Sequence, residues 1–133
     1  MEPSLETGLL GEAKTVVSEK NSAITLGSGS IPVFGTPAMV ALMENAALNS
    51  VQPYLPEGLT TVGIKIASSH IAATPMGMEV TAKSELTEID GKRLVFIIEA
   101  FDGKEKIGEG SHERFVINIE KFMRKNQEKK ENL

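Results

Sequence analysis

The sequence contains no cysteine, and only 5% of its residues are aromatic. Without cysteine, neither disulfide bonds nor thiolate chemistry contribute to the protein, and the redox compartment stays open. Basic charge is also scarce, because the formal net charge is −4. This excludes the basic surface that is typical of nucleic-acid-binding proteins. A small phosphate-bearing ligand remains compatible with this charge, since it needs only a few local cations.

Several sequence patterns are missing as well. The first residues, MEPSLETGLLGEAK, have no basic segment followed by an apolar one, so they do not form a secretion signal. No apolar run is long enough to span a bilayer, and no histidines and carboxylates have metal-ligand spacing. No glycine-rich phosphate motif is present. These absences predict a cytoplasmic protein with no membrane or nucleic-acid partner and no metal.

What is present is enough for one folded unit. The chain has 133 residues, of which 41% are hydrophobic, a size and composition typical of a single domain with a real core. We therefore expect one domain over residues 1–133, with a charged, frayed helical tail over residues 121–133. The patterns predict one long helix and a series of strands: a helix over residues 36–51, and strands over residues 13–18, 60–72, 78–86, 93–101 and 105–119.

The order of these elements predicts an α+β fold. Thr36-Pro37 is typical of a helix start, and Asp90-Gly91 is a strong hairpin turn between two strands. The helix is apolar on most sides, so it needs cover on most sides. A curved antiparallel sheet of five strands wrapped around the helix provides that cover. Because one helix leaves sheet faces or edges exposed, we also expect a homodimer.

Glu44 is the residue that does not fit its surroundings. It is the only charged residue between Pro37 and Val51, and its helical neighbours three and four residues away are apolar. A buried carboxylate needs a hydrogen bond, a cation or water. His70 is the candidate partner, because it alternates in phase with Val62, Ile64 and the other apolar residues of its strand. A carboxylate facing an imidazole in a dry interior can form a general-base pair, although each could instead be structural.

Thr36 has two interpretations. As a helix N-cap, its hydroxyl would be occupied by the backbone, whereas as a site residue it could bind a carbonyl or assist as a nucleophile, close to the helix N-terminus. An ideal helix separates Thr36 from Glu44 by about 12 Å along its axis. The two cannot touch on one regular helix, so either the chain bends or they reach one substrate from different places, such as two subunits.

At these residues the sequence resembles the fluoroacetyl-CoA thioesterase-like family of hotdog-fold proteins. Three segments carry the resemblance: TPAMVALMENAA (36–47), TTVGIKIASSHIAATPMGM (60–78) and IGEGSHERFVINIEKF (107–122). The resemblance implies the five-stranded sheet around one helix and the dimer already expected. It also implies a catalytic Thr36, Glu44 and His70, with substrate-binding roles for Gly63 and Arg114. His112, on the same strand face as Arg114, is interpreted as part of a polar pair at the dimer seam.

The resemblance implies hydrolysis of a small acyl-CoA to free acid and CoA, with CoA as part of the substrate and no cofactor. Glu44 would activate water or attack the carbonyl, and His70 would act as acid or base. The CoA phosphates would meet scattered cations such as Lys65, Lys83 or Arg93. Phe34 is interpreted as a core anchor rather than a lid. The alternatives are a non-catalytic acyl-CoA-binding dimer, an enoyl-CoA hydratase and a purely structural dimer.

Overall fold

The computed structural model describes residues 5–133, so residues 1–4 of the expected domain lie outside the described part. Two short 3-10 helices, η1 (Glu19–Asn21) and η2 (Gln52–Tyr54), flank the long helix. The main elements follow the chain in this order: β1 (Leu10–Val16), α1 (Thr36–Val51), β2 (Leu59–His70), β3 (Glu79–Asp90), β4 (Arg93–Phe101), β5 (Lys106–Asn118) and α2 (Ile119–Glu131). No helix in the described residues is long and apolar enough to cross a membrane.

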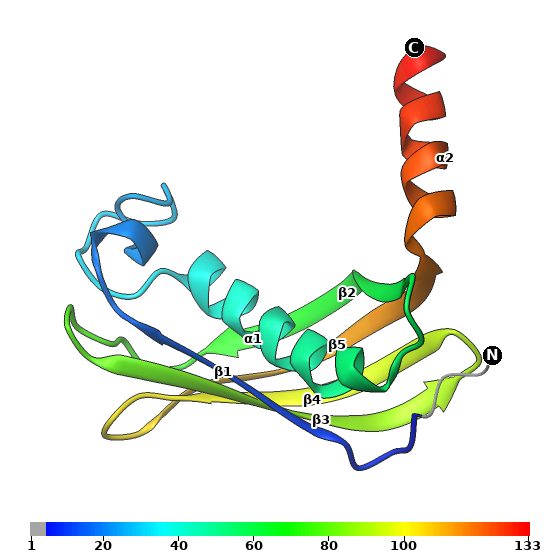
Figure 1. The fold of residues 1–133 in the computed structure, drawn as a ribbon. Coiled ribbons are helices and arrows are strands. Elements are labelled where there is room, and N and C mark those ends of the chain that lie inside the picture. Colours follow the sequence, from blue (N-terminus) through cyan, green and yellow to red (C-terminus); the bar gives the residue numbers. More distant parts are fainter. Residues whose placement is uncertain (1–4) are drawn as a thin grey trace.

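The five strands form one antiparallel sheet in the order β1-β3-β4-β5-β2. The sheet curves around α1, which lies along its concave face (Figure 1). This is the predicted hotdog architecture. The observed helix α1 has the predicted bounds. The predicted turn at Asp90-Gly91 joins β3 to β4, and Gly91 has a φ of 60°. The first strand starts earlier than predicted, at Leu10 rather than at residue 13.

The core lies between α1 and the middle of the sheet. Met39, Met43, Ala46 and Ala47 of α1 are fully buried. The alternation predicted for β3 is confirmed, because its even-numbered residues from Val80 to Leu86 are buried while the odd-numbered ones are exposed or half-buried. Burying each large apolar side chain contributes roughly 1.5–3 kcal/mol to folding. The core therefore fixes α1, and the polar groups on it, against the sheet.

Small residues let α1 approach β1 closely. A Cβ built on Gly11 of β1 would lie only 2.6 Å from the Ser50 Cβ of α1, so a side chain at this position would push the two elements apart. The Ser84 hydroxyl donates to the Ala46 carbonyl over 2.9 Å and ties β3 to the same stretch of helix. Close packing and this buried hydrogen bond set the rotation of α1 over the sheet.

The register of β2 corrects the sequence interpretation of its faces. His70 was grouped with Val62 and Ile64 on one apolar face, but the β2–β5 register shifts between Gly63 and Lys65. The shift makes Ile64 an extra residue, which is 51% exposed, and it reverses the alternation. Before the bulge, Thr61 and Gly63 face α1, and after it Ile66 and His70 do. The prediction for His70 is confirmed, whereas those for Val62 and Ile64 are wrong.

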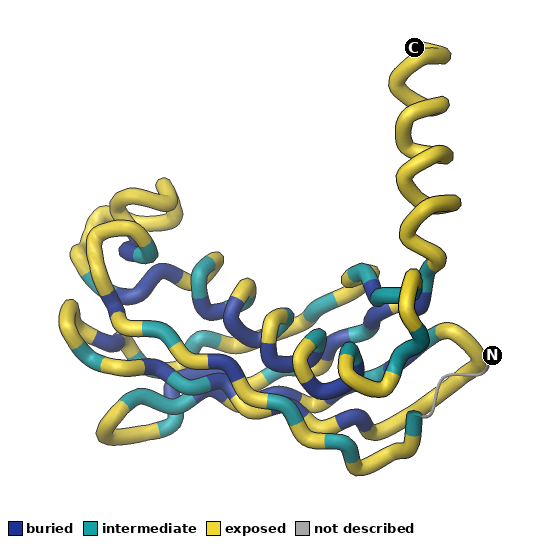
Figure 2. Tube along the Cα trace, in the orientation of Figure 1, coloured by how far each residue is buried: buried dark blue, intermediate teal, exposed yellow. Residues whose placement is uncertain are grey.

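The C-terminal segment forms a helix that stands away from the sheet. α2 follows directly after β5 and projects on the same side of the sheet as α1 (Figure 1). All of its residues are exposed, which Figure 2 shows as a continuous exposed stretch from the end of β5 to the C-terminus. Asn118 caps it by accepting a hydrogen bond from the Lys121 N–H over 3.0 Å. The predicted solvated helix thus begins at Ile119.

Candidate active site

Two groups of polar residues lie along α1, and the first is at its start. Gly35 is the N-cap, and Thr36 is the first helical residue, so of the two interpretations of Thr36 the N-cap one is wrong. Its hydroxyl is therefore free of the backbone and lies 2.7 Å from Nδ1 of His70. The other ring nitrogen of His70, Nε2, is the only buried side-chain nitrogen or oxygen in residues 5–133 that lacks a hydrogen-bond partner. A buried nitrogen without a partner is costly, which makes it a natural contact for a ligand.

A pocket of about 310 Å³ opens beside this pair. Its lining comes from the loop before α1 and from the chain after β2: Ala23, Ser28, Val33, Phe34, Thr36, His70, Ile71, Ala72 and Ala73. No lining residue carries a carboxylate, a lysine or an arginine. Phe34 is 1% exposed and meets the His70 ring edge-on at 6.5 Å, which fits its interpretation as a core anchor. The pocket is therefore small, and His70 is its only titratable lining residue.

The first turn of α1 offers few backbone donors to this pocket. The N–H groups of Ala38 and Met39 both donate to the Gly35 carbonyl over 3.0 Å, and Pro37 has none. The N–H of Thr36 and the helix dipole are what remains for a developing negative charge. The side chains of Thr36 and His70 therefore carry most of the polar chemistry at this end of the helix.

The second group surrounds Glu44, two turns further along α1. A Cβ built on Gly63 would lie 3.0 Å from Oε2 of Glu44, 3.2 Å from Cε1 of His112 and 3.5 Å from Nη1 of Arg114. Gly63 thus brings the β2 backbone close to these three side chains. Glu44 is half-buried, and it takes part in none of the ion pairs within residues 5–133. Its carboxylate is available to a substrate or a water.

Arg114 is held rigidly in this group. Its Nε donates to the Thr61 hydroxyl over 2.7 Å, and its Nη2 donates to the Thr61 carbonyl over 2.9 Å. Its Nη1 lies 3.1 Å from Nε2 of His112, and Nδ1 of that histidine lies 2.7 Å from the Lys65 carbonyl. Both side chains are buried within one chain, with exposed fractions of 1% for His112 and 7% for Arg114. Their burial therefore requires no second subunit.

The hydrogen bonds fix the protonation of His112. Because a carbonyl oxygen only accepts, Nδ1 must carry the proton and donate to Lys65, which leaves Nε2 to accept from the Arg114 guanidinium. Burial is the main cause that lowers the pKa of His112. The hydrogen bond to the Lys65 carbonyl opposes it most strongly, the charge of Arg114 lowers the pKa further, and the charges of Glu44 and Glu113 oppose it more weakly. Burial also lowers the pKa of Arg114, while the charge of Glu44 opposes the change.

Burial likewise lowers the pKa of His70. The backbone of Ala72 lies near the ring and opposes this decrease in the pKa more weakly, although it forms no hydrogen bond with Nε2. The neutral imidazole is therefore the resting form at neutral pH, and it can accept a proton. This suits a general base or a group that orients one.

The structure divides the five predicted site residues into one group of two and one group of three. Thr36 and His70 meet, and Glu44 meets Gly63 and Arg114, but no hydrogen bond or ion pair joins Glu44 to His70 in the described residues. Thr61 was not singled out from the sequence. If the bulge at Ile64 could have been recognised in the sequence, the alternation of β2 would have placed Thr61 on the face toward α1. Among the described residues, no group of three or more potential metal ligands occurs.

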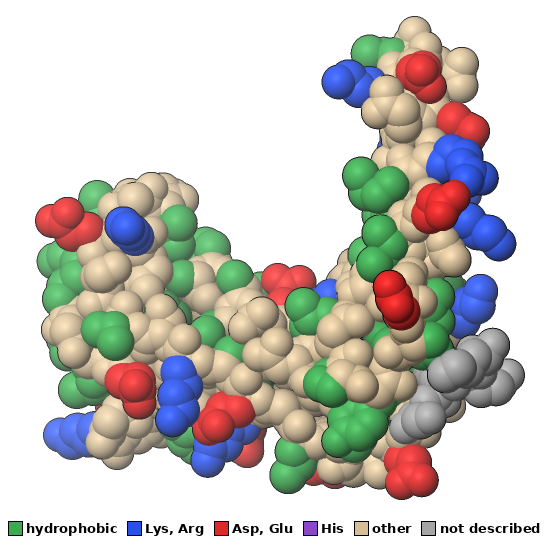
Figure 3. All heavy atoms as spheres, viewed as in Figure 1, with side chains coloured by type: hydrophobic (Ala, Val, Ile, Leu, Met, Phe, Trp, Pro, Cys, Tyr) green, Lys and Arg blue, Asp and Glu red, His purple; other side chains and the backbone are tan. Residues whose placement is uncertain are grey.

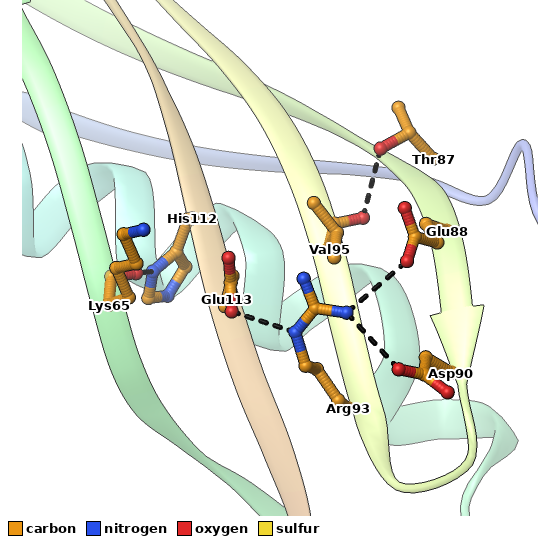
Figure 4. A network of polar contacts seen from close by, with 8 residues as sticks. All are labelled: Lys65, Thr87, Glu88, Asp90, Arg93, Val95, His112 and Glu113. Carbon is orange, nitrogen blue, oxygen red and sulfur yellow. Dashed lines mark hydrogen bonds and ion pairs between the residues drawn. The ribbon is translucent and has the colours of Figure 1, made fainter.

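The cations considered for CoA phosphates lie away from both groups. Arg93 bonds to Glu113 over 2.9 Å and also pairs with Glu88 and Asp90, on the outer side of the sheet (Figure 4). Lys83 lies over the ring of Phe101. Lys65 pairs in register with Glu113, and so its side chain shares that outer face. The prediction that these three residues meet the phosphates gains no support from their positions.

Comparisons with known proteins identify the family. A sequence profile described as fluoroacetyl-CoA-specific thioesterase, FlK, matches residues 17–120. The fluoroacetyl-CoA thioesterase of Streptantibioticus cattleyicolor is 45% identical over 97 residues, which cover 73% of this chain and 70% of that protein.

Solved structures that are similar to this chain indicate the same fold and the same class of enzyme. A mutant of the thioesterase FlK, crystallised with fluoroacetate and CoA, is 38% identical with a TM-score of 0.82, covering 89% of this chain and 99% of that chain. A thioesterase superfamily member from Thermus thermophilus is 27% identical with a TM-score of 0.88, covering 99% of this chain and 97% of that one. The match confirms both the fold and the thioester hydrolase class predicted from the sequence. The chain belongs to the fluoroacetyl-CoA-specific thioesterase family of hotdog-fold acyl-CoA thioesterases.

Proposed function

We propose that this chain is a single-domain, cytoplasmic thioesterase that hydrolyses a small acyl-CoA at a site of Thr36, Glu44 and His70, with Gly63 and Arg114 at the substrate. The observation that carries the proposal is the 2.7 Å contact between Thr36 and His70, beside a small pocket without charged lining. Family membership supplies the CoA thioester as substrate class. A cytoplasmic location follows from where acyl-CoA is found.

Hydrolysis forms a bond between a water oxygen and the acyl carbon and breaks the bond between that carbon and sulfur. Glu44 either takes the proton from the attacking water or attacks the carbonyl first, giving a mixed anhydride that water then opens. His70 accepts and returns a proton, and the Thr36 hydroxyl holds the ring or the carbonyl. The departing CoA thiolate is a good leaving group and needs little acid assistance.

The site is completed, in this proposal, by a homodimer formed at β2. β2 is an edge strand that pairs only with β5 among the described strands, and one polar group lies near each end of it. An unpaired edge is a template for another strand. Antiparallel pairing of two copies about a two-fold axis through Ala67, with Ile64 as the extra residue of each strand, would bring His70 of one subunit next to Gly63 of the other. Glu44 of the second subunit then faces the first subunit's Thr36 and His70.

Release of free thiol from acetyl-CoA and longer acyl-CoAs tests the activity. Glu44→Gln should lower kcat by about 10²- to 10⁴-fold, the range for losing a general base, while the exposed Glu57→Gln control should not. A full-rate Glu44→Gln enzyme would refute the role of Glu44. If acyl-CoA raised the melting temperature of the wild type without releasing thiol, the protein would be a binder rather than a hydrolase.

Mixed dimers test the sharing of the site. Co-expression of a His70→Ala subunit with a Glu44→Gln subunit should restore activity, because one of the two sites in the mixed dimer receives an intact His70 and an intact Glu44. Each variant alone should be inactive. If the mixed dimer stayed inactive, each subunit would hold a complete site, and the shared arrangement would be wrong.

A further inference from the structure

No residue that lines the acyl pocket carries a lysine or arginine side chain. Residues 21–43, which form the loop before α1 and its first half, include no lysine, arginine, aspartate or glutamate. Residues 66–78, which run from the end of β2 to the start of β3, contain only His70 as a titratable side chain. CoA carries a pyrophosphate and a 3′-phosphate. Protein cations that bind these groups would come from outside the pocket lining, either from this chain or from a second subunit.

α2 carries a row of lysines without acidic partners. Lys121, Lys125 and Lys129 follow one another at intervals of four residues, so they lie on one side of the helix. None of the ion pairs within residues 5–133 includes them, whereas the neighbouring Arg124 pairs with Glu120 over 2.9 Å. Like charges at this spacing destabilise an isolated helix slightly. The lysine row, as we call these three residues, is thus suited to an external anion.

The rest of α2 also lacks a partner. Apolar side chains lie along the side of the helix that faces the body of the molecule, and most of its lysines and arginines lie on other sides (Figure 3). Ile119, Phe122 and Met123 are 44%, 37% and 59% exposed. The loop before α1 also exposes apolar residues, with Ile24 at 51% and Ile31 at 59%. Both surfaces would be covered if α2 of one subunit stood beside this loop of the other.

The proposed dimer places them together. Asn118, the residue before α2, pairs with Leu59 at the start of β2. In an antiparallel β2 pair, the start of one strand lies near the end of the other, which leads into residues 71–75 beside the pocket. α2 projects on the same side of the sheet as α1 (Figure 1). Its 13 residues extend for about 20 Å. It would therefore rise next to the entrance of the second subunit's pocket.

We propose that the lysine row of α2 binds the phosphate groups of the CoA held in the other subunit's site. This assignment rests on the proposed thioesterase site and its β2 dimer. It gives the otherwise isolated helix a role in substrate binding, and it supplies the cations that the pocket lacks.

Comparison of two substrates tests the lysine row. The triple variant Lys121→Gln, Lys125→Gln, Lys129→Gln should raise KM for acetyl-CoA about tenfold, as expected for the loss of three exposed ion pairs, with kcat within about twofold. KM for acetyl-pantetheine, which lacks these phosphates, should not change. A matched triple variant, Lys14→Gln, Lys92→Gln, Lys104→Gln, at exposed lysines outside α2, should behave as wild type. An unchanged KM for acetyl-CoA, or an equal rise with both substrates, would overturn the proposal.

Mixed dimers show which subunit supplies the row. When a His70→Ala subunit is combined with a Glu44→Gln subunit, the one active site has the Glu44 of the His70→Ala chain. Lysine substitutions on that chain should raise KM for acetyl-CoA, and the same substitutions on the other chain should not. The reverse result would overturn the crossing of α2. A wild type that hydrolyses neither substrate would instead refute the proposed function itself.

Discussion

The Thr36 hydroxyl and Nδ1 of His70 lie 2.7 Å apart, although 34 residues separate them in the sequence. The contact exists because Gly35, not Thr36, caps α1 and because the bulge in β2 turns His70 toward the helix. The two side chains face a pocket that holds no other strong hydrogen-bonding side chain except Ser28. The start of α1 is therefore built around this pair.

Removing the Thr36 hydroxyl should separate its chemical role from a packing role. Thr36→Ala should lower kcat about 10²-fold or more, because His70 loses the group that orients its ring, whereas Thr36→Ser should retain most of the activity. Thermal unfolding should change little in either variant, because the hydroxyl does not cap the helix. Thiol-release kinetics and a melting curve would measure both. Equal activities of the alanine and serine variants would show that the hydroxyl is not needed.

A side chain at Gly63 should disturb the Glu44 group without unfolding the protein. In Gly63→Ala, the new Cβ would approach Oε2 of Glu44 to 3.0 Å, which forces the flexible carboxylate to move by a few tenths of an ångström. We expect a fall in kcat of about tenfold or more, since small displacements of a catalytic group are costly. Gly103→Ala is a suitable control, because its φ is not positive and its new Cβ would meet only the Met78 side chain, at 3.8 Å or more. Unaltered kinetics of Gly63→Ala would show that the position of Glu44 is not critical.

Arg114 should be more sensitive to truncation than to a conservative change. Arg114→Ala leaves Thr61 and His112 without their hydrogen-bond donor in a buried place, and we expect a loss of about 1–3 kcal/mol for each unsatisfied group in the free energy of unfolding. Arg114→Lys keeps the charge near Glu44 but not the forked contacts to Thr61, so it should be less destabilised. Urea unfolding would give both values. Equal loss in the two variants would show that charge near Glu44 does not contribute.

Stability should fall as the pH drops below about 6.5, the unfolded pKa of histidine. Burial lowers the folded pKa of His112 and of His70, so at mildly acidic pH the unfolded chain binds more protons than the folded one. The contribution is complete above the unfolded pKa and is lost as the pH falls toward the folded values. Urea unfolding between pH 5.5 and 7.5 should show this slope, and His112→Gln should reduce it. An unchanged slope in the variant would place the proton uptake elsewhere.

Local sequence patterns determined most of the fold. The apolar stretch with Pro37 predicted the helix with the bounds that the structure shows. The alternation around Val80, together with Asp90-Gly91, predicted two strands and the hairpin that joins them. These features depend on neighbouring residues, on helical or strand periodicity and on turn chemistry, all of which are visible in a single sequence. The unusual carboxylate Glu44 in an apolar helix was visible for the same reason.

Tertiary structure alone decided how the polar groups meet. The sequence placed Glu44 opposite His70, but within one chain Glu44 lies by Gly63 and Arg114, and His70 lies by Thr36. One bulge at Ile64 reverses which residues of β2 face the helix, and a shift of the cap to Gly35 frees the Thr36 hydroxyl. Both depend on how long-range strand pairing and packing accommodate one extra residue. Periodicity within a segment carries no information about that.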